Sequence, residues 1–88
     1  MKFISIGYGN MVATDRIVTL VTPESAPIKR MIQDAKDAGR VIDVSCGKKT
    51  KSVIITDSEH IILSAVKTET IAMRLEGIDG GDDDEEPA

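Results

Sequence analysis

The sequence is short of the residue types that build large cores, disulfides and most metal sites. Its 88 residues include one Phe, one Tyr, one Cys, one His and no Trp, so we expect an almost wholly aliphatic core. A domain of this size buries a smaller fraction of its surface than a larger one, and a single small core rarely supplies more than about 3 to 5 kcal/mol. We therefore expect one domain that is completed by a partner, as a homo-oligomer.

Cysteine and long apolar runs are too scarce for several classes of protein. Cys46 stands alone, which excludes an intrachain disulfide and a cysteine-based zinc site, and we expect no metal site. The apolar start Phe3–Ile6 gives way at once to a turn, Gly7–Asn10, and is too short for a signal peptide or a membrane span. We expect a cytoplasmic protein without a membrane partner.

The motifs of enzymes are also missing. His60 is the sole histidine and has no Ser/His/Asp or Cys/His spacing around it, although Cys46 and His60 could meet across a hairpin. A lone Cys and a lone His more often serve packing or local hydrogen bonds. Gly7–Asn10 lacks the third glycine and the helix start of a dinucleotide-binding fingerprint. We expect no catalysis, no cofactor and no small-molecule substrate.

Charge is placed unevenly along the chain. The net charge of −4 argues against a nucleic-acid partner, because such partners favour a basic surface. Six of the fifteen acids, however, lie between Asp79 and Glu86, which leaves nine acids against eleven basic residues in residues 1–78, a net charge of +2. Residues 78–88 carry too little apolar surface to repay the entropy of ordering. We predict a disordered acidic tail there, after a domain of residues 1–77.

The pattern of apolar, β-branched and turn residues predicts an α+β fold with a small, largely antiparallel sheet. We expect strands at Phe3–Ile6, Met11–Ala13, Arg16–Val21, Val41–Val44, Ser52–Thr56 and His60–Val66. The strand Arg16–Val21 is mostly apolar, which favours burial on both faces. Val41–Val44 and Ser52–Thr56 flank Gly47, so they can form a hairpin whose tip carries lysines.

Two helices complete the predicted fold. Across Ser25–Ala38 the apolar residues recur at helical spacing, Pro27 fits the first turn and Gly39 suits the C-terminal cap, so this is the principal helix. Thr68 can cap a short last helix, Glu69–Glu76.

Three lysines lie within four positions, and they make the main candidate for contact with double-stranded DNA. Lys48, Lys49 and Lys51 follow Gly47, and a glycine lets the backbone approach a phosphate closely. Lysines also protect exposed strand edges from aggregation, and that interpretation stays open.

Two further groups of basic residues are candidates for the same contact. At about 100° per residue, Lys29, Lys36 and Arg40 fall within roughly 40° of one another on the principal helix, a basic stripe that could also be an ordinary solvated flank. Arg16 stands at the entrance to an apolar strand, where its fork-shaped side chain could hold a phosphate or pair with guanine. A local salt bridge is the alternative for Arg16.

Four segments carry a family resemblance: Lys2–Asn10, Arg16–Ile17, Pro23–Arg30 and Thr56–Ser64. On these segments, the chain resembles the RemA family of bacterial extracellular matrix regulatory proteins from residue 2 to about residue 76. The resemblance implies a LytTR-like fold and a ring-shaped homo-oligomer that needs no cofactor. It also implies a DNA-binding regulator of the transcription of biofilm matrix genes.

The resemblance further implies that Arg16 and the segment Gly47–Lys51 contact DNA and that Pro27 matters to function. The family carries Gly-Arg-Arg-Thr-Arg at this segment, whereas this chain has lysine at positions 48, 49 and 51. Lysine keeps the positive charge but lacks the planar fork of arginine, so contact with the DNA backbone is favoured over base readout.

Our hypothesis is that a ring repeats this modest basic patch, so that several weak contacts engage one bent or wrapped DNA. The acidic tail could compete with DNA for the lysines, or it could serve solubility alone. The alternative function is a structural or protein-binding oligomeric module that recruits its partner by pairing at a strand edge.

Overall fold

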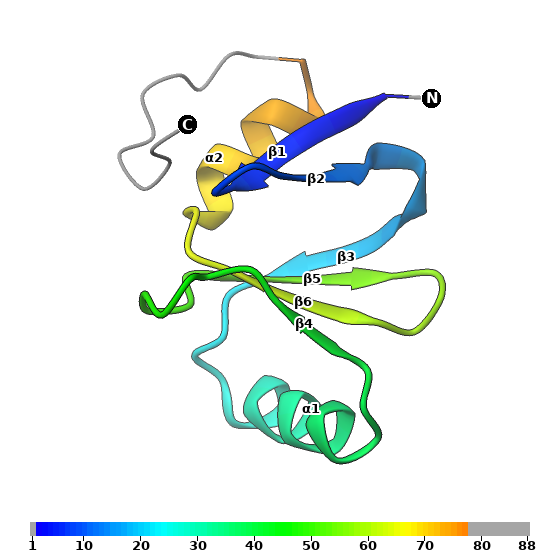
Figure 1. The fold of residues 1–88 in the computed structure, drawn as a ribbon, viewed down its shortest axis with the longest axis vertical. Coiled ribbons are helices and arrows are strands. Elements are labelled where there is room, and N and C mark those ends of the chain that lie inside the picture. The colour runs from blue at the N-terminus through cyan, green and yellow to red at the C-terminus, as the bar shows by residue number, and fades with distance from the viewer. Residues whose placement is uncertain (1, 78–88) are drawn as a thin grey trace.

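The computed structural model describes residues 2–77, and the predicted acidic tail, residues 78–88, lies outside them. Within the described part, the strands are β1 (Phe3–Gly7), β2 (Asn10–Ala13), β3 (Ile17–Val21), β4 (Val41–Asp43), β5 (Ser52–Thr56) and β6 (Ile61–Ser64) (Figure 1). The helices are α1 (Ala26–Asp37) and α2 (Thr68–Leu75), and a 3-10 turn, Thr14–Arg16, precedes β3. Neither α-helix is both long and apolar enough to cross a membrane. The α+β prediction is confirmed.

The strands form one mixed sheet and one hairpin. In the mixed sheet the order is β3-β5-β6-β4, and β5 pairs antiparallel with both β3 and β6. β4 lies parallel to β6, with Val41 opposite Ile61. β1 and β2 form a separate antiparallel hairpin. Most pairings are therefore antiparallel, as the sequence predicts.

The mixed sheet is the middle of three layers, with α1 on one face and the β1–β2 hairpin with α2 on the other (Figure 1). The core on the hairpin side consists of Ile4, Ile6, Val12, Ile54, Ile62, Val66 and Ile71. The core under α1 consists of Val53, Ile61 and Leu63, covered in part by Ile28, Ile32 and Ala35. Successive side chains of a strand point to opposite faces, so β5 and β6 supply both cores.

The principal helix begins and ends where local signals indicate. The hydroxyl of Ser25, the N-cap residue, accepts a hydrogen bond from the amide of Ile28 at 3.4 Å, and Pro27 lies in the first turn. After the C-cap residue Ala38, Gly39 takes a left-handed conformation, at φ +73°.

The similarity of this fold to LytTR-type domains stays a prediction.

The predicted hairpin of Val41–Val44 and Ser52–Thr56 is wrong. β4 and β5 are not neighbours, because β6 lies between them and pairs with both. An apolar pattern indicates which face of a strand is buried, but it does not select the neighbouring strand. All four residues of β6 are buried, which suits a central position. The lysines therefore lie on a loop that crosses the end of β6, not at a hairpin tip.

Three smaller predictions are also corrected. β3 is not buried on both faces, because it is an edge strand and Val18 is 64% exposed beside an irregularity between Ile17 and Thr19. Arg16 belongs to the 3-10 turn that precedes the strand. Thr68 is the first residue of α2 and not its cap, and its hydroxyl donates to the carbonyl of Lys51 at 3.1 Å.

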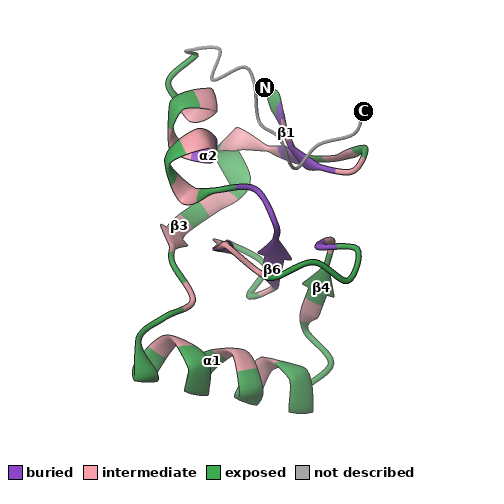
Figure 2. Cartoon of the chain, turned by 90° about the vertical axis from the view of Figure 1, so that its left-hand side faces the viewer, coloured by how far each residue is buried: buried purple, intermediate pink, exposed green. Residues whose placement is uncertain are grey.

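Both outer layers leave apolar surface uncovered. No residue of α1 is buried (Figure 2). Ile28, Ile32 and Ala35, which pack against the core under this helix, are half-buried. On the β1–β2 hairpin, Phe3 and Met11 are 55% and 57% exposed. Exposed apolar patches on small proteins often mark interaction sites, and the homo-oligomer stays a prediction.

We predict that Ser64→Ala lowers the free energy of unfolding by about 1 to 3 kcal/mol, because it removes the partner of two buried backbone groups. The hydroxyl of Ser64 donates to the carbonyl of Ile6 at 2.8 Å and accepts from the amide of Val66 at 3.0 Å. Urea denaturation followed by circular dichroism measures the change. The control is Ser58→Ala, which removes an exposed hydroxyl that bonds the side chains of Thr56 and His60 and no buried backbone group, and equal losses in the two variants would contradict this role of Ser64.

Candidate nucleic-acid interface

The loop between β4 and β5, residues 44–51, begins with a turn that Asp43 holds in place. Its Oδ1 accepts hydrogen bonds from the amide of Ser45 at 2.9 Å and from the hydroxyl of Ser45 at 2.6 Å. The amide of Lys48 donates to the carbonyl of Ser45 at 3.0 Å and closes a four-residue turn. Its central residues, Cys46 and Gly47, have φ of +55° and +79°, as in a type I′ turn, where glycine is favoured.

The second half of the loop is fastened to the end of β6 and to the start of α2. The amide of Lys51 donates to the carbonyl of Ser64 at 2.8 Å, and the carbonyl of Lys51 accepts from Thr68. One residue further on, the buried hydroxyl of Ser52 donates to the carbonyl of Val66 at 2.9 Å. These bonds fix the backbone on which the lysines stand.

The lysine side chains extend from this fixed backbone. Lys48 and Lys49 are exposed, and neither forms an ion pair with another residue of 2–77. Lys51 is half-buried. The loop thus offers two ammonium groups to solvent from a backbone that is held at both ends, an arrangement suited to phosphate contact.

Arg16 and Arg40 lie at the other end of the mixed sheet. Nε of Arg16 is 2.9 Å from Oδ1 of Asp57, so a salt bridge is present, and Nη1 of Arg40 is 2.7 Å from Oε1 of Glu59. Both carboxylates belong to the turn after β5. The five residues of β5 rise by about 3.3 Å per residue, so the backbone of this turn lies about 13 Å or more from the backbone of Lys51. One chain therefore does not bring these arginines beside the lysine loop.

The predicted basic stripe on the principal helix is incomplete. Lys29 and Lys36 are exposed on α1. Arg40 is not on the helix, because α1 ends at Asp37 and the left-handed Gly39 turns the chain before Arg40. The extension of the helical pattern beyond Gly39 is wrong.

Cys46 and His60 do not meet. Cys46 lies in the lysine loop, whereas His60 lies in the turn between β5 and β6, at the other end of β5. Nδ1 of His60 is 2.8 Å from the hydroxyl of Ser58, a local hydrogen bond of the kind that a lone histidine usually forms.

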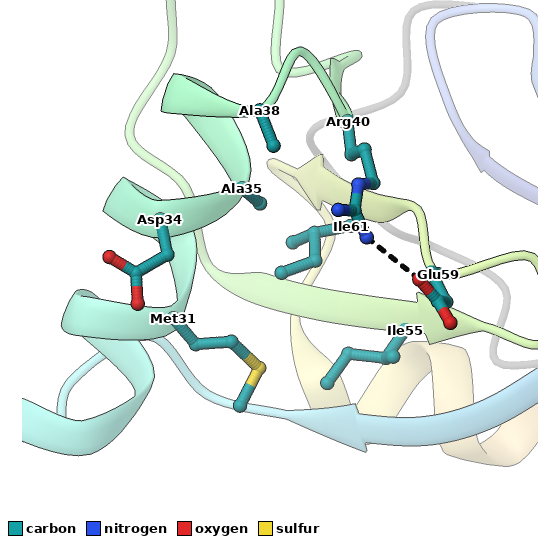
Figure 3. Close-up of a pocket in the computed structure, with 8 residues that line it drawn as sticks. All are labelled: Met31, Asp34, Ala35, Ala38, Arg40, Ile55, Glu59 and Ile61. Atoms are coloured by element: carbon teal, nitrogen blue, oxygen red, sulfur yellow. Dashed lines mark hydrogen bonds and ion pairs between the residues drawn. The ribbon is translucent and has the colours of Figure 1, made fainter.

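A hollow of about 320 Å³ opens between α1 and the mixed sheet, apart from the lysine loop (Figure 3). Its lining residues are Met31, Asp34, Ala35, Ala38, Arg40, Ile55, Glu59 and Ile61. The ion pair of Arg40 with Glu59 lies at its edge, and most of the other side chains are apolar. The hollow therefore belongs to the uncovered apolar surface of α1, not to the basic site.

Sequence reasoning missed Lys67. This exposed residue directly precedes α2 and lines a polar hollow together with Lys49 and Lys51. It stands 16 residues after Lys51 in the chain, so no local pattern connects the two. The one signal in the sequence was a lysine next to the predicted start of the last helix.

The fold and the loop define a class, a small α+β domain that presents lysines on a fixed loop. The model of the RemA-like family, described as extracellular matrix regulatory protein A-like, matches residues 3–75. The chain belongs to this family.

Three relatives are similar over nearly their whole length, and each is named as a candidate regulatory protein, not as an enzyme. The protein of Geobacillus thermodenitrificans is 61% identical over 79 residues, 90% of this chain and 91% of the relative. That of Clostridium acetobutylicum is 57% identical over 81 residues, 92% and 88% of the two chains. That of Desulfitobacterium hafniense is 53% identical over 88 residues, 100% and 97% of the two chains.

The hydroxyl and the amide of Ser45 lower the pKa of Asp43 below its ordinary value of 3.8, and the charge of Lys36 adds to this. A carboxyl with a lowered pKa in the folded state stabilises the fold above its ordinary pKa, and this contribution is lost as the pH falls through the lowered value. We predict that Asp43→Asn is less stable than wild type at neutral pH and that the difference shrinks as the pH falls below 3.8 and through the lowered pKa of Asp43.

Urea denaturation at a series of pH values from about 7 to about 2.5 measures this dependence. Asp34→Asn is the control, because it removes an exposed carboxylate of α1 that is not part of the loop. A stability difference between wild type and Asp43→Asn that stays constant down to the lowest pH would contradict the prediction.

Proposed function

We propose that this protein is a transcriptional regulator of the RemA type, which binds double-stranded DNA and controls extracellular matrix (biofilm) genes. The observation that carries the proposal is the lysine loop, in which hydrogen bonds at both ends hold the backbone under Lys48, Lys49 and Lys51. A phosphate contact gains when the backbone that carries the positive side chains is already ordered before binding, because less of the chain has to be ordered on binding. Membership of a family described as regulatory supports the same function.

The proposed contact is with the DNA backbone. Lysine offers a compact ammonium group that attracts phosphate but cannot form the bidentate pair that arginine forms with guanine. Gly47 serves the contact indirectly, because its φ of +79° shapes the turn that presents Lys48. Preference for particular sites would then come from the shape and deformability of the DNA.

The proposed active form is a ring-shaped homo-oligomer. A ring requires two different surfaces on each subunit that fit one another, and apolar side chains are exposed both on the β1–β2 hairpin and around α1. Repetition adds the contributions of weak basic patches along one DNA molecule. In this proposal, Arg16, Lys29, Lys36 and Arg40 add positive charge on other parts of each subunit, which a long DNA molecule reaches along the ring, and Pro27 shapes the start of α1.

We predict that replacing Lys48 and Lys49 together by Ala weakens binding to duplex DNA and flattens its salt dependence. The plot of log affinity against log salt has a negative slope, and each phosphate that the protein no longer neutralises should make this slope less steep by about 0.9. Fluorescence anisotropy with a labelled duplex at several salt concentrations measures the slope. The double variant Lys2→Ala/Arg30→Ala is the control, because it removes the same charge at two exposed positions outside the proposed contact.

Light scattering with and without duplex DNA separates this function from the alternative of a protein-binding module. We expect a wild-type oligomer that gains the mass of the DNA, and a Lys48/Lys49 variant with the same oligomer mass that gains less. An oligomer that gains no mass from DNA at low salt would refute DNA binding and favour the alternative. Equal salt slopes for the loop variant and the control variant would remove the loop from the proposal.

A further inference from the structure

A polar hollow of about 310 Å³ joins the lysine loop to the start of α2. Its basic residues are Lys49 and Lys51 of the loop and Lys67, which directly precedes α2. Three ammonium-bearing side chains from two segments of the chain therefore border one concave surface.

Hydrogen bonds on both sides of Lys67 fix its position relative to the loop. Before it, the carbonyl of Val66 accepts from Ser52, and after it, Thr68 donates to the carbonyl of Lys51 at 3.1 Å. Lys67 itself is exposed and extended, with φ −62° and ψ +145°, and it forms no ion pair with another residue of 2–77. Its backbone, from which the charged side chain extends, thus stands at a defined place beside Lys51.

We propose that Lys67 is a further DNA-contact residue and that the hollow between it and the lysine loop receives one phosphate of the DNA backbone. This inference rests on the proposed function. Lys67 comes from a segment with no place in the sequence motif Gly47–Lys51, so the contact surface extends from the loop to the start of α2.

The same hollow is also lined by two carboxylates, Glu24 and Glu69, which lower its attraction for anions. Three lysines against two glutamates leave a net charge of only +1. A free phosphate ion gains little from so small a charge. A phosphate within a DNA backbone is held near the hollow by contacts elsewhere along the same molecule, so the local attraction acts at high effective concentration.

Lys67→Ala tests the inference in the full-length protein, with duplex DNA as the probe and anisotropy as the readout. If this variant neutralises one phosphate fewer, we expect the slope of log affinity against log salt to be less steep by about 0.9. The affinity should be lower by up to about eightfold near 0.1 M salt. Lys67→Arg keeps the charge and should bind nearly as wild type does. Glu69→Gln removes an opposing carboxylate from the hollow and should strengthen binding.

The matched control is Lys2→Ala, which removes one exposed positive charge far from the hollow in the chain. Thermal melts of all variants check the fold, and no loss of an N-terminal cap is expected because Lys67 makes no side-chain cap bond.

If Lys67→Ala and Lys2→Ala make the salt slope less steep by the same amount, Lys67 acts only through net charge and the inference is overturned. Competition by millimolar inorganic phosphate at constant ionic strength would overturn the assignment to a backbone phosphate. Absence of DNA binding in the wild type would instead refute the proposed function itself.

Discussion

The buried strand β6 determines where the basic loop lies. Because β6 lies between β5 and β4, the chain that links those two strands has to cross the end of β6. At this crossing, the backbone amide of Lys51 donates to the carbonyl of Ser64. The hydroxyl of Ser64 also donates to the carbonyl of Ile6 in β1. The hairpin, the central strand and the lysine loop therefore share one set of hydrogen bonds at one end of the sheet. A change that weakens this end acts on the stability of the core and on the position of the lysines together.

The fold could be predicted as far as local signals reach. Pro27 and Gly39 act within one turn of their own positions, so the limits of α1 were readable from the sequence. The strand that pairs with β4 could not be predicted from the sequence. Val41–Val44 has an apolar pattern that suits pairing with any buried strand, and the choice of β6 depends on how all the strands share two cores. Glycine at position 47 suggested a tight hairpin, but the same glycine serves a turn within a longer loop.

The candidate site shows the same division. The lysines at positions 48, 49 and 51 stand out because they are close together in the chain. Lys67 does not stand out, because only the tertiary fold brings it to the lysine loop. For the same reason, Asp57 and Glu59 do not stand out as the partners of Arg16 and Arg40. The stabilising role of Asp43 was also missed, although an aspartate whose side chain accepts from the backbone amide two residues further on is a common way to start a turn. Charge clusters are thus visible in a sequence, whereas the groups that position or neutralise them are not.

The distribution of positive charge favours a long ligand over a small one. The lysine loop and Arg16 lie at opposite ends of β5, with their backbones about 13 Å or more apart, so a long ligand reaches both more readily than a small anion does. Asp57 and Glu59 offset the charges of Arg16 and Arg40 through exposed ion pairs, each worth only about 0.2 to 1 kcal/mol. A polyanion such as duplex DNA can displace such weak partners at one end once the lysines hold it at the other. In this proposal the loop and Lys67 supply the first contact, and the arginines contribute only to a ligand long enough to reach them.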